Sequence, residues 1–246
     1  MSKYDINILH IYPDLLNLYG DSGNIAALTK RLTWRNIDVS VTKCLEDDKI
    51  PDLDIFDIIF LGGGSDREQE TVCKRLCDRK EDFKKYVEND GVLLATCGGF
   101  PMLGNYYLNS TTKVDGLGIL DIYTDLSTKR LISDVILDSE LISHPIVGFA
   151  NHATCTHIRD YTPLGRVAHG YGNTSESNFE GVIYKNVIGT YLHGPLLPKN
   201  PQLCDYILTC ALKKKYSEFT ELTSINDELE YKANEYMINR FKNEKA

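Results

Sequence analysis

The sequence has no excess of basic residues, and this lack limits the partners that it can bind. Its 246 residues include 27 Lys and Arg against 35 Asp and Glu, a formal net charge of −8. A protein that neutralises several phosphates of a nucleic acid needs clustered basic side chains. We therefore expect no nucleic-acid partner.

Long apolar runs are also absent. The longest, Ile55–Leu61 and Gly91–Ala95, fall far short of the ~18–20 residues that span a bilayer. The N-terminus has no export signal, because Asp5 and Asn7 interrupt its apolar stretch. Seven cysteines, an odd number in a chain of this length, fit a reducing compartment better than a disulfide framework. We expect a cytoplasmic protein that does not insert into a membrane.

Strands and helices alternate through the first half of the sequence. Apolar, β-branched runs that predict strands are followed by stretches with helical spacing of apolar residues, as in a parallel sheet covered by helices. The expected strands are INILHIY, IDVSVTKC, FDIIFLGGG and GVLLAT, and the expected helices are SGNIAALTKRLTWRN and a charged stretch from Arg67 to about Asn89. Ligands of such a sheet bind at the carboxyl ends of its strands.

The second half consists mainly of short strands separated by turn residues, which is typical of antiparallel pairing. VIYKNVIGTY predicts a hairpin that turns at Lys185 and Asn186. Two helices are expected to follow, a polar one that ends in NRFKNEKA and, before it, one with the apolar stripe Leu203, Ile207, Leu208 and Leu212. No repeat or linker divides the chain. We predict an α/β fold with a mostly parallel sheet flanked by helices, antiparallel strands in the second half, and one domain over residues 1–246.

Cys97 is the most informative residue. A strand that ends in a cysteine, followed by Gly98, Gly99 and a helix, predicts a sharp turn that projects the side chain above the sheet, as in the nucleophile elbow of hydrolases. Pro101 fits the first turn of that helix. The helix N-terminus is expected to lower the pKa of the thiol and make it reactive at neutral pH. The alternative is a buried structural cysteine.

A thiolate nucleophile needs a base, and His193 in GTYLHGP is the best candidate because it ends a predicted strand. Without Cys97 in the chain, a solvated loop residue would be the better interpretation of this histidine. Gly63 and Gly64 close another strand, and their backbone N–H groups, with that of Gly98, are candidates to hold an oxyanion. A plain turn between strand and helix is the alternative for these glycines.

Metal binding is not expected. His152, Cys155 and His157 are close in sequence, but period-two alternation sends His152 to the opposite face of its strand and no fourth ligand is near. Cys73 and Cys77 share a helical face without further ligands, so we interpret them as packing or surface thiols.

Four blocks, in this order along the chain, resemble one family: PDLLNLYGDSGN, LGGGSDRE, ATCGGFPMLG and GTYLHGPLLPKNP. The last three are similar to the cobyric-acid-synthase type of class I glutamine amidotransferase. The first narrows the resemblance to the GatD-type glutaminase subunits of lipid II isoglutaminyl synthase. The resemblance covers nearly the whole chain and implies a class I glutamine amidotransferase-like, flavodoxin-like fold.

The resemblance also implies an activity and roles for single residues. Cys97 would attack the side-chain amide of L-glutamine to form a thioester, with His193 as base and acid and with Gly63 or Gly64 and Gly98 as oxyanion donors. Arg130 would contact the glutamine α-carboxylate, although an arginine that opens a strand is as often simply solvated. Ammonia would pass to a Mur-ligase-like synthetase subunit that amidates the D-glutamate of lipid II.

The same resemblance places the cofactors on the partner. The chain has no GxxxxGK[ST] phosphate loop, so ATP and Mg²⁺ are expected on the synthetase subunit, and no cofactor is expected here. The lipid-linked substrate of that subunit would recruit the heterodimer to the inner face of the membrane. Three alternatives remain: an amidotransferase subunit for another acceptor such as a corrinoid acid, an elbow-cysteine protease or deglycase, and a non-catalytic binding subunit.

Three departures from the family pattern stand out. Many relatives have glutamine at the position of Pro101, and a glutamate is common at that of Ala150. Class I triads usually read His-x-Glu, whereas His193 is followed by Gly and Pro, so the orienting acid is not local. We expect an Asp or Glu of the partner, or less readily Asp66, to orient His193.

Overall fold

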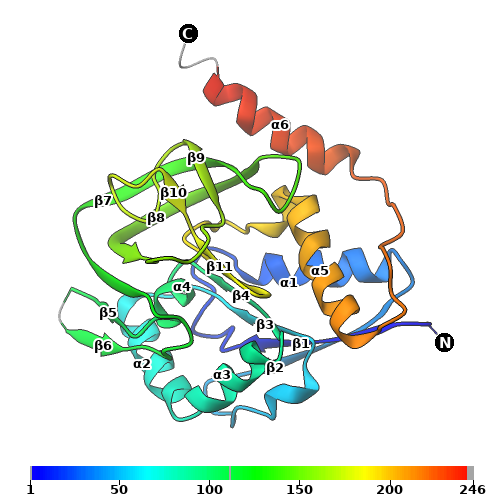
Figure 1. Ribbon diagram of the computed structural model, residues 1–246, viewed down its shortest axis with the longest axis horizontal. Coiled ribbons are helices and arrows are strands. Elements are labelled where there is room, and N and C mark those ends of the chain that lie inside the picture. The colour runs from blue at the N-terminus through cyan, green and yellow to red at the C-terminus, as the bar shows by residue number, and fades with distance from the viewer. Residues whose placement is uncertain (1, 111, 243–246) are drawn as a thin grey trace.

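Two β-sheets and the helices around them make up the structure, a computed structural model that describes residues 2–110 and 112–242 (Figure 1). The first sheet consists of β1 (Asp5–Ile11), β2 (Asp38–Cys44), β3 (Ile58–Leu61), β4 (Val92–Thr96), β11 (Val182–Tyr184) and β12 (Val187–Thr190). These strands lie in the order β11-β12-β4-β3-β1-β2. Only β11 runs antiparallel to its neighbour, so the predicted parallel sheet and the predicted hairpin are both confirmed.

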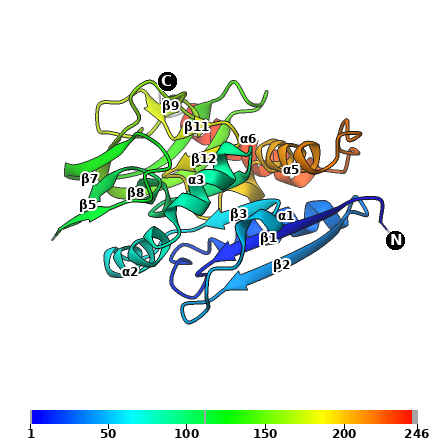
Figure 2. The ribbon, with the colours of Figure 1, turned by 60° about the horizontal axis from the view of Figure 1, so that its bottom comes forward.

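Helices cover both faces of this sheet (Figures 1 and 2). They are α1 (Ser22–Thr33), α2 (Asp66–Cys77), α3 (Lys80–Glu88) and α5 (Pro201–Lys215), with a 3-10 turn at Leu53–Ile55. Alternate residues of each strand point to opposite faces. On one face, Ile8 and Leu94 pack with α1 and α5, and on the other Leu9 and Leu93 pack with α2 and α3. The apolar stripe that the sequence predicts for α5 is buried.

The helical stretch predicted from Arg67 to about Asn89 forms two helices, because the helix is interrupted between α2 and α3 at Asp78 and Arg79. A helix of that length would extend over about 34 Å, at ~1.5 Å per residue. The five-residue strand β4 measures only about 17 Å. Two shorter helices therefore cover the sheet better than one long helix.

The second sheet consists of β5 (Tyr106–Leu108), β6 (Lys113–Asp115), β7 (Tyr123–Asp138), β8 (Ile146–His157), β9 (Gly165–His169) and β10 (Phe179–Glu180). Its order is β10-β9-β7-β5-β6, and β8 pairs with β7. Antiparallel pairing dominates, as predicted, but the sequence did not predict a separate sheet. An antiparallel bridge between Phe149 and His193 joins β8 to the loop after β12.

Ion pairs anchor the C-terminal part of the chain. Arg31 of α1 contacts Asp205 of α5 at 2.6 Å and Asp227 at 2.5 Å, and Arg35 contacts Asp205 at 2.6 Å. The two arginine side chains are only 4% and 3% exposed. The last helix, α6 (Glu228–Lys242), follows Asp227 directly and lies across the top of Figure 1. Residues 243–246 of the predicted polar helix lie outside the described residues.

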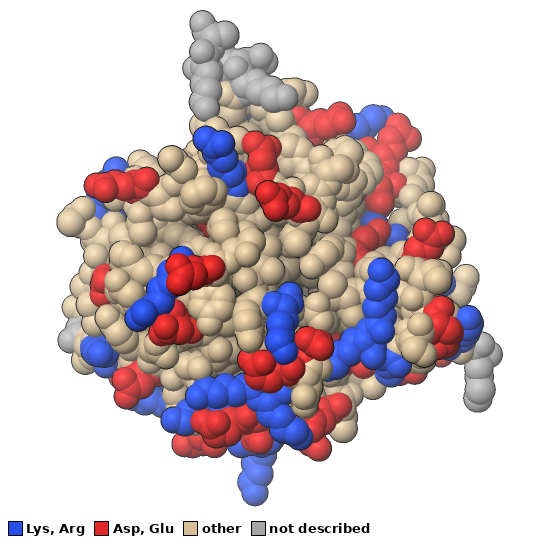
Figure 3. Space-filling view, in the orientation of Figure 1, with Lys and Arg blue, Asp and Glu red and all other residues tan. Residues whose placement is uncertain are grey.

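Acidic and basic side chains are interspersed on the face shown in Figure 3, most densely along its lower edge. Several form ion pairs between elements, such as Lys85 with Asp54 at 2.5 Å and Lys185 with Glu88 at 3.1 Å. Among the described residues, no helix combines the length and the apolar character that crossing a membrane would require.

Candidate active site

Four parallel strands of the first sheet end side by side, and the loops that follow them meet at one place. The register pairs Leu61 of β3 with Ala95 of β4, and Thr190 of β12 with Thr96 of β4. The N–H of Cys97 donates to the carbonyl oxygen of Thr190 at 2.8 Å. The predicted site residues that follow these strands are therefore brought to the same sheet edge.

Cys97 occupies a strained turn between β4 and α4 (Gly99–Met102). Its φ is +51°, a left-handed conformation that is uncommon for residues with a side chain. Gly99 needs to be glycine, because a Cβ there would lie 2.7 Å from the Leu61 carbonyl oxygen, whereas a Cβ on Gly98 would meet only the end of the flexible Gln69 side chain, at 2.3 Å. The structure thus has the elbow geometry that the sequence predicts.

The prediction that the Cys97 thiol has a lowered pKa is wrong. The pKa of this thiol is raised to about 12, mainly by burial and then by the nearby Asp21 carboxylate, although the Gly98 N–H and Arg130 lower it. The helix that was expected to stabilise the thiolate, α4, is only four residues long, so its dipole is small. The resting nucleophile is therefore a protonated thiol.

Cys97 opens into a cavity of about 340 Å³. Gly64, Gly98 and Arg130 line it too, so the structure brings most of the predicted site residues together. Gly63 packs behind Cys97, since a Cβ at Gly63 would lie 2.7 Å from the Cys97 Cβ. Its N–H points to Asp21 Oδ2 at 3.4 Å, which leaves Gly64 and Gly98 as the glycines that face the cavity.

Arg130 reaches the cavity from an irregular part of the second sheet. The register of β7 with β8 shifts between Leu126 and Leu131, so Arg130 lies in the unpaired stretch. Its Nε donates to Asn151 Oδ1 at 2.6 Å, and Asn151 Nδ2 donates to the Tyr19 hydroxyl at 3.0 Å. The side chain is exposed, yet it is held at the cavity wall rather than free in solvent.

His193 lies three residues beyond the end of β12, not at the strand end as predicted. It is fully buried, and burial, aided by Lys199, lowers its pKa to about 4, so the ring is neutral at pH 7. Neither ring nitrogen makes a hydrogen bond with any described residue, Cys97 included. Tyr19, which lines the cavity, stacks on the ring with centroids 4.0 Å apart, whereas His193 itself does not line the cavity.

No carboxylate of the described chain orients His193. Asp66, the less favoured prediction, lines the cavity but contacts the Ser110 hydroxyl at 3.4 Å. Glu180 precedes His193 in the sequence and is buried, but its carboxylate oxygens accept hydrogen bonds from Thr190 and Tyr191 instead. The orienting acid is therefore missing from the resting site.

Sequence reasoning missed several residues of the cavity. His152 stacks on Tyr191, with centroids 3.6 Å apart, and its Nε2 has no hydrogen-bond partner among the described residues. Asp21 does not line the cavity, but it accepts a hydrogen bond from the Thr96 hydroxyl at 2.9 Å and its carboxylate raises the pKa of Cys97. The block PDLLNLYGDSGN contains Tyr19 and Asp21, and its position after β1 was the signal that these two side chains belong to the site.

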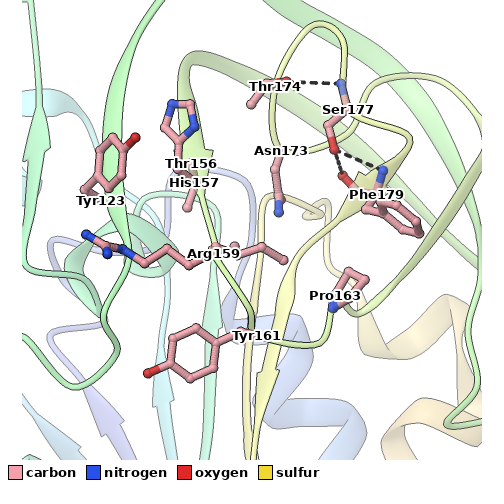
Figure 4. A pocket seen from close by; sticks show the side chains of 11 residues that line it. Tyr123, Thr156, His157, Arg159, Tyr161, Pro163, Asn173, Thr174, Ser177 and Phe179 are labelled. Atoms are coloured by element: carbon pink, nitrogen blue, oxygen red, sulfur yellow. Dashed lines mark hydrogen bonds between the residues drawn. The ribbon is translucent and has the colours of Figure 1, made fainter.

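A second, larger hollow of about 750 Å³ lies on the second sheet (Figure 4). In Figure 4, Tyr123 and Arg159 lie on the opposite side from Ser177 and Phe179. None of the predicted site residues lines it. His157, which does, stacks on Tyr123 and pairs with Asp125 at 3.5 Å. The described residues contain no group of three or more metal-ligating side chains, here or elsewhere.

Comparisons with known proteins identify the family of this chain. A family model described as a CobB/CobQ-like glutamine amidotransferase domain matches residues 7–201. A GatD subunit of lipid II isoglutaminyl synthase (glutamine-hydrolyzing) from Staphylococcus aureus strain N315 is 43% identical over 243 residues, which is 98% of each chain. The GatD subunit from Streptococcus pneumoniae strain R6 is 41% identical over 229 residues, 91% of this chain and 87% of that protein.

A solved structure of a glutamine amidotransferase shares the fold, with a TM-score of 0.50 and 16% identity over 82% of this chain and 98% of that one. The chain therefore belongs to the CobB/CobQ-like glutamine amidotransferases. Within this family it is similar over nearly its whole length to GatD subunits. The predicted fold class, family and enzyme class are confirmed.

The charges around Cys97 lead to a prediction about its reactivity. Asp21→Asn should speed alkylation of Cys97 by iodoacetamide at pH 8, because the Asp21 carboxylate raises the pKa of the thiol. Arg130→Ala should slow it, because the guanidinium lowers that pKa. A change of half a pKa unit alters the thiolate fraction, and so the rate, by ~3-fold when the pKa is far above the pH.

Mass spectrometry of the Cys97 peptide over time measures this rate, and Cys155 in the same samples serves as an internal reference. If both variants react at the native rate, or if both rates change in the same direction, these two charges do not control the pKa of the thiol.

Proposed function

We propose that this chain is the glutaminase subunit of a glutamine-dependent amidoligase. It hydrolyses L-glutamine to glutamate and ammonia, and a partner subunit uses the ammonia to amidate the D-glutamate of lipid II. One observation carries the proposal: the strained Cys97 turn opens into a cavity that also holds an arginine and two backbone glycines. The GatD relatives, which are named as glutamine-hydrolyzing subunits, support the substrate and the acceptor.

Substrate binding follows from the cavity wall. The Arg130 guanidinium forms a charge-assisted, bidentate pair with the α-carboxylate of glutamine. This contact directs the side-chain amide toward Cys97. The sulfur attacks the amide carbon, a C–S bond forms, and the carbonyl oxygen becomes an oxyanion. Gly64 and Gly98 line the cavity, and their N–H groups stabilise this oxyanion.

Proton transfer is the task of His193. The neutral imidazole takes the thiol proton as the C–S bond forms and gives it to the amide nitrogen, so the C–N bond breaks and ammonia leaves. The product is a thioester of Cys97. His193 then removes a proton from a water molecule that attacks the thioester, and the proton returns to the sulfur as glutamate departs.

The resting arrangement differs from the reacting one in two respects. His193 has no hydrogen-bond partner on either ring nitrogen, and Tyr19 is stacked on its ring. In a catalytic triad an acid fixes the tautomer of the imidazole and stabilises the imidazolium. An Asp or Glu of the partner supplies this acid, and the same contact moves Tyr19 from the His193 ring. Hydrolysis of glutamine is thereby linked to complex formation.

The partner also carries the remaining chemistry. Amidation of a carboxylate requires its activation, and the chain has no phosphate loop for ATP. The resemblance to GatD subunits implies that this partner is a Mur-ligase-like synthetase, and we propose that it binds ATP and Mg²⁺. Because its substrate is anchored to a lipid, the complex works at the inner face of the membrane.

Removal of the nucleophile tests the proposal directly. Cys97→Ala should lower kcat for glutamine hydrolysis by ~10⁴-fold or more while the fold is retained, because no other group can form the thioester. A glutamine analogue with an electrophilic side chain should label the native chain at Cys97. Cys155→Ala is the matched control and should keep full activity. A label on Cys155, or activity in Cys97→Ala, would refute the nucleophile.

The role of Arg130 predicts a change in KM. Arg130→Ala should raise KM for glutamine by ~10- to 100-fold, because a charge-assisted contact contributes about 1.5–3 kcal/mol to the binding free energy. Arg130→Lys should restore part of this loss, because it keeps the charge without the bidentate geometry. Arg159→Ala removes a guanidinium from the other hollow and should leave KM unchanged. An unchanged KM in Arg130→Ala means that the carboxylate binds elsewhere.

The missing acid predicts activation by the partner. The isolated chain should hydrolyse glutamine slowly, and addition of the subunit that co-purifies with it should raise kcat at least ~10-fold, or about 1.4 kcal/mol of transition-state stabilisation. Mass spectrometry identifies that subunit. Equal rates with and without it would mean that Cys97 and His193 act without an external acid.

A further inference from the structure

Glu180 is a buried carboxylate that connects the second sheet to the catalytic loop. It ends β10 and has no exposed surface. Its Oε1 accepts hydrogen bonds from the N–H of Tyr191 at 2.7 Å and from Thr190 Oγ1 at 2.9 Å, and its Oε2 lies 2.8 Å from the same hydroxyl. No Lys or Arg of the described residues forms an ion pair with it. Thr190 and Tyr191, which hydrogen-bond its side chain, lie at the end of β12 and directly after it.

These contacts fix the stretch that holds both catalytic groups. The carbonyl oxygen of Thr190 accepts the N–H of Cys97 at 2.8 Å. The hydroxyl of Thr190, which donates to Glu180, accepts the N–H of Leu192 at 3.1 Å. Glu180 therefore binds one N–H of the stretch directly and a second through Thr190, and His193 is the next residue.

The environment of Glu180 argues against a purely space-filling role for its side chain. Burial raises the pKa of Glu180 to about 7, and the Tyr191 N–H and the Thr190 hydroxyl offset only part of that effect. A buried carboxyl without a cation is costly, and an apolar side chain of similar volume would avoid this cost. An apolar side chain, however, would leave the Tyr191 N–H without an acceptor and the Thr190 hydroxyl free to rotate.

We propose that Glu180 is a positioning residue of the glutaminase site, which holds residues 190–193 so that Cys97 and His193 keep their relative placement. It does not touch the cavity, so it acts through Thr190 and Tyr191. This inference rests on the proposed glutaminase function. A displacement of 1 Å at reacting groups can lower a rate by about 100-fold.

The test compares kcat and KM for glutamine in the full chain with its co-purified partner subunit. Glu180→Leu should lower kcat by ~100-fold and change KM by less than ~3-fold, since Arg130 binds the substrate from another strand. Glu180→Gln, which retains one acceptor oxygen, should recover at least ~5-fold of that loss. Thr190→Val removes the hydroxyl from the same network without altering Glu180 and should lower kcat by ~10-fold at an unchanged KM.

Asp205→Leu is the matched control, because it removes a carboxylate that pairs with Arg31 and Arg35 and does not line the cavity. It should destabilise the protein to urea but leave kcat unchanged below its unfolding transition. Circular dichroism shows that each variant is folded at the assay temperature, and if Glu180→Leu does not fold, Glu180→Gln and Thr190→Val decide.

The outcomes separate the two proposals. If the native complex does not hydrolyse glutamine, both are refuted. If it does, and the folded Glu180 and Thr190 variants keep kcat within ~2-fold of the native value, only the role of Glu180 is refuted. A loss confined to KM would also refute it, because it would assign Glu180 to substrate binding.

Discussion

The parallel pairing of β4 with β12 is the contact on which the rest of the site depends. It brings two segments almost 100 residues apart in sequence into register, so that the N–H of Cys97 meets the carbonyl oxygen of Thr190. The nucleophile is held by the strand turn, while the histidine is held by the loop on the neighbouring strand. The second sheet then adds Arg130 to the cavity wall, and its Glu180 holds the N–H of Tyr191 after β12. The cavity is therefore a product of both sheets.

Burial determines the chemical state of the two central groups. It raises the pKa of Cys97 and lowers that of His193, so both are uncharged at rest. A thiolate and imidazolium pair, by contrast, would need its own hydration or fixed dipoles. The site is thus stable in a form that reacts slowly with electrophiles other than its substrate. Charge separation becomes favourable only when a bound substrate and an orienting acid supply the compensating interactions.

The sequence predicted the parts of this arrangement that are local. Cys97 with its glycines, the buried strands and the hairpin at Lys185 each follow from a few neighbouring residues. It could not predict contacts between distant segments, such as Tyr19 on His193 or Glu180 below Tyr191, because no periodicity encodes them. The direction of the pKa shift of Cys97 was missed for the same reason. It depends on burial by the whole fold and on the length of α4, and the residues around Cys97 reveal neither.

The left-handed backbone of Cys97 has a consequence for how the chain can change over time. A side chain at φ +51° costs on the order of 1 kcal/mol relative to glycine, out of a folding free energy of typically about 5–15 kcal/mol. Glycine would suit this position better for folding, and it would remove a buried thiol as well. Selection for stability alone would thus drive the nucleophile out of the turn. Cysteine persists there only as long as selection for its chemistry outweighs selection for a more stable fold.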